Sequence, residues 1–184
     1  HRRRDEAVIV HRLDHPVKNH VRLIDAFGIF KERTKHPHRL VLAGLDSLSA
    51  DRIKKHAASS KWSRDIFFTG HFPRQSLPEL YSGADFVVIP SLYEGFGLGA
   101  LEAMASGVPV ACARSASLPE VADQAALYFD PYDCEDMADR MVTLTSDREC
   151  YRDCIARGLE RSKLYSWERC AQATFSLISD FARS

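Results

Sequence analysis

Residues 86–107 read FVVIPSLYEGFGLGALEAMASG. The apolar run at 86–89 is short, rich in β-forming residues and followed by a proline, which predicts a buried strand. Residues 99–106 carry apolar side chains at helical spacing and are followed by a glycine, which predicts a helix. Three glycines alternate in the loop between them: Gly95, Gly97 and Gly99. The stretch therefore predicts a strand, a glycine-rich loop and a helix in succession.

The same alternation extends outward from this stretch in both directions. Short apolar runs predict strands at 7–10, 40–43, 66–69, 86–89, 108–112 and 126–129. Helical spacing predicts helices at 20–35, 49–58, 77–82, 99–106, near 119–121, and at 134–145, 147–162 and 167–181. Runs that are apolar throughout indicate strands buried on both faces, as in a parallel sheet covered by helices. The sequence therefore predicts an α/β fold, a Rossmann-like doubly wound sheet of six parallel strands with helices on both faces and extra C-terminal helices.

Composition limits the possible classes of function. The chain of 184 residues has 25 Lys and Arg and 25 Asp and Glu, so its zero net charge does not favour nucleic acid as a partner. Five cysteines without a C-x-x-C pair favour free thiols in a reducing, cytoplasmic compartment. No apolar run approaches the roughly 20 residues of a membrane span. Because the sequence begins at His1 rather than Met, residues 1–6 are interpreted as a linker remnant before one domain at 7–184.

The loop after residues 86–89 is a candidate binding site. In a doubly wound sheet, ligands bind beyond the carboxyl ends of the strands. Glycine lets the backbone approach a ligand closely, and the free N–H groups at the start of the following helix favour an anion such as phosphate. Glycine-rich loops also serve as plain turns, so the glycines alone leave both interpretations open.

Two glutamates bracket these glycines. Glu94 precedes them, and Glu102 is expected in the first turn of the helix, with seven residues between the two. Carboxylates accept hydrogen bonds from neighbouring sugar hydroxyls, so one glutamate on each side of a phosphate site suits a ribose and a hexose. The alternative is that Glu102 only balances the positive end of the helix and that Glu94 is a solvated loop residue.

The pattern resembles a known family. Glu94-Gly95-Phe96-Gly97, followed by LEAMASGVPV at 101–110, resembles the E-x7-E signature of glycosyltransferase family 4, which has the GT-B architecture. Further segments follow the order of that family: Arg12, Lys18-Asn19, Thr69-Gly70, Leu80-Tyr81, Ala84-Asp85, Pro90-Ser91, 118–121, Asp130-Pro131 and Ser166-Trp167. The resemblance extends from Val8 to the last predicted helix.

The resemblance implies roles for individual charged side chains. In the family, the first glutamate of the pair contacts the donor hexose and the second binds the ribose, which assigns these roles to Glu94 and Glu102. Arg12 and Lys18 are implied to neutralise the donor diphosphate, since fixed cations can stabilise a leaving diphosphate without a metal. Glu94, Arg12 and Lys18 form the predicted catalytic set.

Other donor contacts are implied by the same resemblance. The glycine-rich loop is expected to meet the phosphate or the sugar through Phe96, Gly97, Leu98 and Gly99. The nucleobase is expected near Gly70 and His71. Two positions depart from the family pattern: His11 replaces a common glycine, which makes the conformation of its loop uncertain, and Gly99 replaces a frequent proline.

The implied function is retaining transfer of a hexose from a nucleotide-diphospho-sugar, either GDP-mannose or a UDP-hexose, to a saccharide or lipid-linked acceptor. No cofactor or metal is expected. The resemblance also implies an N-terminal GT-B domain as the partner of this half, and peripheral membrane contact of the full-length enzyme.

Two other functions remain open from the sequence. One is a nucleotide-sugar epimerase or a phosphorylase built on the same kind of half, and the other is a non-catalytic nucleotide-sugar-binding module. The eight histidines have no metal-ligand spacing, and those near the predicted loops, including His20 and His38, are interpreted as solvated.

Overall fold

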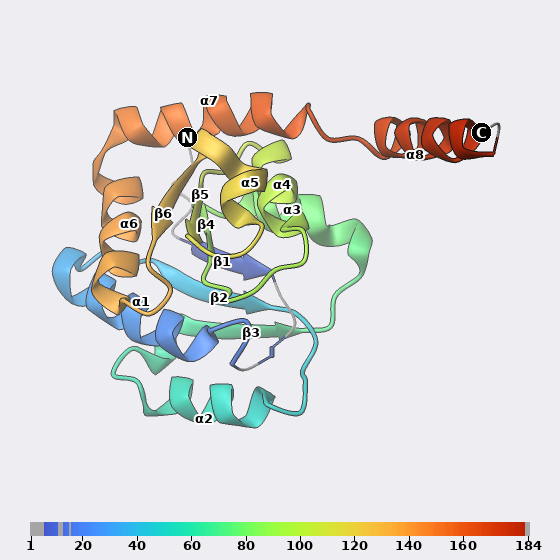
Figure 1. The fold of residues 1–184 in the computed structure, drawn as a ribbon. Coiled ribbons are helices and arrows are strands. Elements are labelled where there is room, and N and C mark those ends of the chain that lie inside the picture. The colour runs from blue at the N-terminus through green and yellow to red at the C-terminus, as the bar shows by residue number, and fades with distance from the viewer. Residues whose placement is uncertain (1–5, 11–12, 15, 183–184) are drawn as a thin grey trace.

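The computed structural model describes residues 6–10, 13–14 and 16–182, with only the backbone described for residues 6–10. The described residues form one sheet of six parallel strands in the order β3-β2-β1-β4-β5-β6 (Figure 1). The strands are β1 (Glu6–Val10), β2 (Arg39–Ala43), β3 (Ile66–Gly70), β4 (Phe86–Ile89), β5 (Val110–Ala113) and β6 (Ala126–Phe129). The predicted doubly wound sheet is confirmed.

Helices connect and cover these strands. They are α1 (His20–Thr34), α2 (Ala50–Ser59), α3 (Leu77–Gly83), α4 (Leu98–Ala105), α5 (Leu118–Ala122), α6 (Cys134–Ser146), α7 (Arg148–Ser162) and α8 (Trp167–Phe181). Single 3-10 turns occur at Ser63–Asp65, Arg74–Ser76 and Asp123–Ala125. These bounds agree with the predicted helices, and α4 begins one residue earlier than expected.

The strand order determines which helices share a face. From β1 the chain moves through β2 to β3 toward one edge, and from β4 it moves through β5 to β6 toward the other. Because such crossovers are right-handed, α1 and α2 lie on one face and α4 and α5 on the opposite face. Helix α6 packs beside α1, and α7 packs on α4, and both also contact strands of the sheet.

Burial along the strands follows their position in the sheet. Every residue of β4 and β5 is buried, as the continuous apolar runs predict. Strand β3 is different, because it lies at the edge and alternates between buried and exposed residues, with Phe67 43% exposed. The expectation that all strands are buried on both faces is therefore wrong for β3, where one neighbouring strand is missing.

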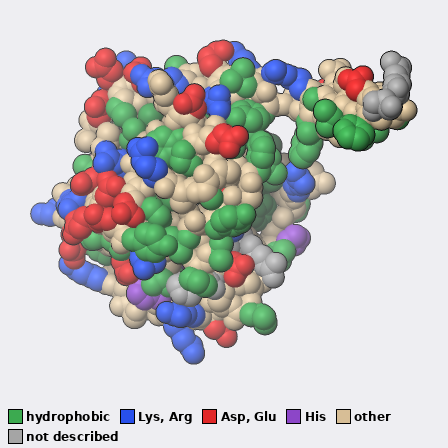
Figure 2. All heavy atoms as spheres, viewed as in Figure 1, with side chains coloured by type: hydrophobic (Ala, Val, Ile, Leu, Met, Phe, Trp, Pro, Cys, Tyr) green, Lys and Arg blue, Asp and Glu red, His purple; other side chains and the backbone are tan. Residues whose placement is uncertain are grey.

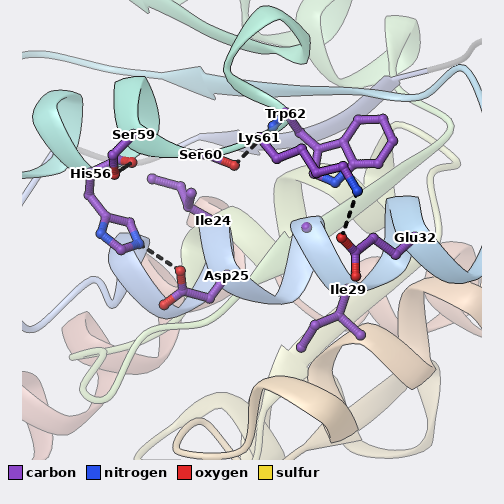
Figure 3. A pocket seen from close by; sticks show the side chains of 10 residues that line it. Ile24, Asp25, Ile29, Glu32, His56, Ser59, Ser60, Lys61 and Trp62 are labelled. Atoms are coloured by element: carbon purple, nitrogen blue, oxygen red, sulfur yellow. Dashed lines mark hydrogen bonds and ion pairs between the residues drawn. The ribbon is translucent and has the colours of Figure 1, made fainter.

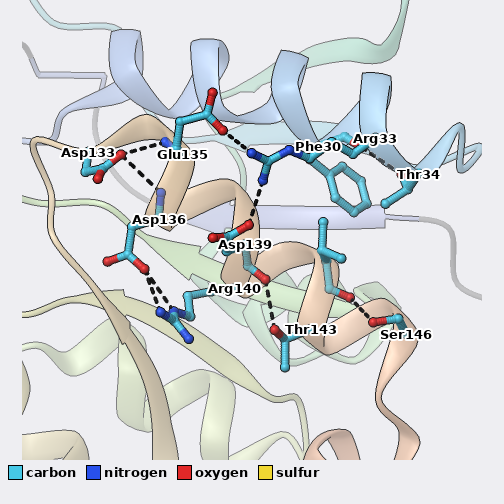
Figure 4. A network of polar contacts seen from close by, with 11 residues as sticks. Phe30, Arg33, Thr34, Asp133, Glu135, Asp136, Asp139, Arg140, Thr143 and Ser146 are labelled. Carbon is cyan, nitrogen blue, oxygen red and sulfur yellow. Dashed lines mark hydrogen bonds and ion pairs between the residues drawn. The ribbon is translucent and has the colours of Figure 1, made fainter.

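Polar contacts fasten α6 to α1 (Figure 4). Asp133 caps α6 by accepting hydrogen bonds from the backbone N–H groups of Glu135 and Asp136, as its position in the sequence suggests. Arg33 of α1 pairs with Glu135 and with Asp139, the latter at 2.6 Å. These ion pairs are exposed, so the buried apolar contacts between α1 and α6 contribute most of the stability.

Helix α8 stands away from the rest of the chain (Figure 1). None of its residues is buried, and its large apolar side chains are mostly exposed, from Ile178 at 60% to Phe181 at 84%. Figure 2 shows hydrophobic side chains on this projecting helix. The apolar side chains of α8 are therefore uncovered in this structure. In the described part of the chain, no helix is both long enough and apolar enough to cross a membrane.

The contact between α4 and α7 has no room for a side chain at Gly158. A Cβ atom there would lie 3.1 Å from Cγ and 3.3 Å from Cβ of Met104. We expect Gly158→Val to lower the free energy of unfolding by about 1–3 kcal/mol, because the added methyl groups must push α7 away from α4. Gly83→Val is the matched control, since nothing lies within 4 Å of a Cβ there; it should change stability by less than about 0.5 kcal/mol. Urea denaturation measures both, and equal effects would contradict the close packing.

Candidate functional site

The strand order reverses where β1 and β4 lie side by side, and we call the place between the loops that follow these two strands the crevice. The chain leaves these two neighbours toward opposite edges of the sheet, so the loops that follow them diverge. Lys18 lies in the loop after β1, and Glu94 lies in the loop after β4. Their side chains meet in the structure, with Lys18 Nζ 2.7 Å from Glu94 Oε2. Two of the predicted catalytic residues, 76 positions apart in sequence, are thus brought together.

The Lys18–Glu94 ion pair is partly withdrawn from water, since the two side chains are 20% and 11% exposed. A backbone hydrogen bond next to it, from the Leu92 N–H to the Val17 carbonyl at 2.8 Å, ties the same two loops together. The third predicted catalytic residue, Arg12, and its neighbour His11 lie outside the described residues.

The glycine-rich loop directs the N-terminus of α4 toward this crevice. Gly97 is the N-cap and has a φ of 97°, which side chains rarely tolerate. A Cβ at Gly97 would also lie 3.1 Å from Cδ2 of Leu118. The helix begins at Leu98, so its first N–H groups, including those of Leu98 and Gly99, have no partner within the helix and favour an anion.

A third loop, which follows β5, holds the backbone of the loop that contains Glu94. After β5, Ser117 donates a hydrogen bond from its hydroxyl to the Glu94 carbonyl at 3.0 Å, and Ser115 donates to the Ser91 carbonyl at 2.7 Å. The sequence predicted no role for either serine. The only sequence feature that could have pointed to these serines is their position just after a strand, at the end of the sheet where ligands bind in this kind of fold.

Glu102 lies on α4 beyond its first turn, which contains no acidic residue. The expectation of a first-turn position is wrong because the helix starts earlier than predicted, and the helix-end interpretation of Glu102 loses its basis. The carboxylate accepts a hydrogen bond from the Tyr81 hydroxyl at 3.2 Å. Burial raises the pKa of the Tyr81 phenol well above its ordinary value of 10.0, and the Glu102 charge raises it further. The phenol therefore stays a hydrogen-bond donor that orients Glu102.

Phe96 is half exposed in the glycine-rich loop and touches the segment between α7 and α8. Its ring lies edge-on to that of Tyr165, with 5.9 Å between the centroids. Arg161 fixes this segment by donating to the Tyr165 hydroxyl at 3.0 Å and to the Val121 carbonyl at 2.9 Å. The sequence predicted no role for Tyr165, whose contact depends on residues far away along the chain.

Gly70 and His71 lie at the carboxyl end of β3. They lie at the carboxyl ends of the strands, as do the loops of Lys18 and Glu94, but β2 separates β3 from β1. Gly70 has a φ of 65°, and His71 is exposed. The structure therefore places these two residues to one side of the ion pair rather than against it.

A cavity of about 340 Å³ lies elsewhere, between α1 and the end of α2 (Figure 3). Charged side chains pair across it, His56 with Asp25 at 2.6 Å and Lys61 with Glu32 at 3.1 Å. Trp62 forms part of the wall, and none of the predicted site residues lines the cavity. It is therefore separate from the crevice at β1 and β4.

The histidines differ from expectation in two places. His38 is buried and lies 3.0 Å from a carboxylate oxygen of Asp85, and His20 is buried at the start of α1. Both were interpreted as solvated loop residues, and that interpretation is wrong because the helix and strand that follow the loops draw them into the core. Among the described residues, no group of three or more His, Cys, Asp or Glu is arranged to hold a metal ion.

Comparison with known sequences decides the family. Residues 2–161 match the family described as glycosyl transferases group 1. The chain belongs to this family. The match covers β1 to α7 and so includes every loop of the crevice.

This group 1 chain has relatives among characterised transferases. It is 35% identical over 164 residues to O-antigen chain mannosyltransferase B of Escherichia coli, covering 88% of this chain and 42% of that protein. Its structure superposes on sucrose-phosphate synthase of Thermosynechococcus elongatus with a TM-score of 0.87 at 27% identity, covering 97% of this chain and 46% of that one. The structure of HepE of Anabaena, in complex with UDP and glucose, superposes with a TM-score of 0.85 at 19% identity, covering 95% of this chain and 48% of HepE. At this low identity, the likeness supports the fold alone. The chain spans less than half the length of each of these proteins.

The raised pKa of Tyr81 in this group 1 chain predicts a dependence of stability on pH. The phenol ionises near pH 10 in the unfolded chain but remains neutral in the folded one, so the free energy of unfolding should fall as the pH rises above about 10. Tyr81→Phe should remove part of this slope and cost about 1 kcal/mol at pH 7 through the lost hydrogen bond. Urea denaturation at several pH values measures both. Tyr93→Phe, at an exposed position, is the control, and an unchanged slope in Tyr81→Phe would contradict the assignment.

Proposed function

We propose that this chain is the donor-binding half of a retaining hexosyltransferase of glycosyltransferase family 4. The observation that carries the proposal is the contact between Lys18 and Glu94 beside the N-terminus of α4. Glu102 lies further along the same helix. One cation, two carboxylates and an anion-binding helix end are thus concentrated at the switch point of the sheet. This combination suits a diphosphate with a sugar on each side.

The roles divide by charge. The helix end, Lys18 and Arg12 bind the diphosphate. Glu102 accepts hydrogen bonds from the ribose hydroxyls, with Tyr81 holding its carboxylate in place. Glu94 accepts hydrogen bonds from the hexose hydroxyls. The loop with Phe96 closes over the sugar, and the nucleobase extends toward Gly70 and His71.

The ion pair of the free protein suggests how the donor is received. Lys18 and Glu94 neutralise each other at 2.7 Å, so neither charge is left unpaired in a partly buried place. An entering diphosphate competes with the carboxylate for the Lys18 ammonium group. Once Lys18 has moved to the phosphate, the Oε2 atom of Glu94 that it held can accept hydrogen bonds from the hexose hydroxyls, so one exchange of partners prepares both ends of the donor.

The same groups act on the reaction. Negative charge develops on the departing diphosphate, and the Lys18 ammonium group, now bound to the phosphate, and the N–H groups of α4 stabilise it. In a front-face mechanism, the departing diphosphate takes the proton of the acceptor hydroxyl as the new glycosidic bond forms. The anomeric configuration is then retained. This route requires no metal or cofactor.

The donor we favour is a mannosyl nucleotide, GDP-mannose, with a UDP-hexose as the second choice. The support is the 35% identity to a mannosyltransferase. The acceptor is a saccharide or a lipid-linked saccharide. We further propose that residues 7–184 form the C-terminal domain after a short linker, that an N-terminal GT-B domain completes the enzyme, and that the enzyme is cytoplasmic with peripheral membrane contact.

Binding of nucleoside diphosphates tests the donor site directly. Glu102→Gln should weaken binding of GDP or UDP by about tenfold or more, because charge-assisted hydrogen bonds to the ribose become neutral ones. Calorimetry measures the Kd values of the wild type and the variant. Glu149→Gln on α7 is the matched control and should bind like the wild type. If neither nucleotide binds the wild type, the chain is not a donor site, and a non-catalytic scaffold becomes the better description.

Turnover separates the donor-binding half from a complete enzyme. We expect this chain alone to bind the nucleotide and to release no nucleoside diphosphate from GDP-mannose or UDP-glucose above the buffer rate. The physical reason is that the acceptor must be held against the sugar by the proposed N-terminal domain. A coupled assay for released nucleoside diphosphate measures this. Robust transfer by these 184 residues would contradict it, and interconversion of the donor sugar would favour an epimerase instead.

A further inference from the structure

Asn19 occupies an unusual place at the base of the crevice. It directly follows Lys18 and precedes α1, and its side chain is fully buried, with an exposed fraction of 0%. An asparagine before a helix ordinarily caps it by accepting a hydrogen bond from the first turn, but this side chain forms no such bond. Its amide group is directed elsewhere.

The amide of Asn19 joins three separate loops. Its Nδ2 donates to the Pro90 carbonyl at 3.1 Å, just after β4, and to the Pro131 carbonyl at 2.7 Å, just after β6. Its Oδ1 accepts from the Arg22 guanidinium at 3.1 Å. Both N–H donors and the acceptor are therefore used, and one buried side chain holds the loops after β1, β4 and β6 at fixed positions.

The backbone explains why asparagine suits this position. Asn19 has a φ of 56° and a ψ of 27°, a left-handed conformation that asparagine and glycine adopt most readily. Glycine would satisfy the backbone but leave the two proline carbonyls without their buried donor. Aspartate would tolerate the backbone and match the shape, but it carries no N–H group. Asparagine supplies both properties.

We propose that Asn19 is the positioning residue of the donor site, which holds the loop of Lys18 against the loop of Glu94 so that the Lys18 ammonium group faces the crevice. This inference rests on the proposed function. Asn19 touches neither the diphosphate nor the sugars in this scheme and acts only through Lys18. The backbone hydrogen bond from the Leu92 N–H to the Val17 carbonyl joins the same two loops, so its strength indicates whether they are held together.

The chain offers a matched control for a purely structural role. Lys31 is a buried polar residue of the same helix, and it donates two hydrogen bonds to main-chain carbonyls, those of His36 at 2.8 Å and His38 at 2.9 Å. It lies near the opposite end of α1 from Asn19. Lys31→Met should lower the Tm as Asn19→Gly does, but the hydrogen bonds that it removes do not involve the loops of the crevice.

The first measurement needs no nucleotide. We expect hydrogen exchange at the Leu92 amide to be at least about tenfold faster in Asn19→Gly than in the wild type, and unchanged within about twofold in Lys31→Met, because Asn19 contacts the loops of the Leu92–Val17 junction and the Lys31 hydrogen bonds lie elsewhere. Asn19→Asp should behave like Asn19→Gly, and if it does not fold, the glycine variant decides the result. Equal protection of Leu92 in the wild type and Asn19→Gly overturns the proposal.

The second measurement tests action through Lys18. Asn19→Gly should weaken binding of GDP or UDP about tenfold in the wild-type background and less than about twofold in the Lys18→Met background. The reason is that Lys18→Met already removes the ammonium group through which Asn19 acts. Equal effects in the two backgrounds, or equal weakening by Lys31→Met, overturn the proposal. If the wild type binds neither nucleotide, the proposed function fails, and Leu92 exchange alone decides whether Asn19 fastens the loops.

Discussion

The adjacency of β1 and β4 is the constraint on which the site depends. Two parallel neighbours whose chains depart in opposite directions leave a crevice that no crossover helix can cover. The loops around it contain main-chain carbonyls that lie near the core and need donors. Asn19 supplies two of these donors, and Ser115 and Ser117 supply others. The loops around the crevice are thus held to one another largely by side-chain hydrogen bonds, with the backbone bond from Leu92 to Val17 beside them.

Most of the fold could be predicted from the sequence because the signals are local. Strand β4 is an unbroken apolar run ended by a proline, and α6 begins at an aspartate that caps it, so each was found close to its observed bounds. The largest boundary difference in the sheet is at β5, which starts at Val110 rather than residue 108. Edge strand β3 was misjudged in burial, since the sequence of a strand does not state how many neighbours it has.

The candidate site was predictable in part. Glu94 and Lys18 were named through a motif, and the structure shows them in contact, which spacing alone did not indicate. The roles of Ser117 and Tyr165, and the contact of Tyr81 with Glu102, were found only in the structure, because each side chain reaches a site residue from another element. The two buried histidines were misjudged for the same reason. Local patterns report on helices and strands, whereas contacts between distant loops depend on the packed core.

The glycines of the central loop look alike in sequence, yet they have different freedom to vary. Gly97 is restricted twice, by its left-handed backbone and by the Leu118 side chain beside it. Gly95 faces open space, with nothing within 4 Å of the position that a Cβ atom would take. Within this chain, a side chain is excluded at position 97 and meets no obstacle at position 95. Of the two glycines, only Gly97 is required by the backbone and packing of the fold itself, so a substitution at position 95 does not imply a changed backbone.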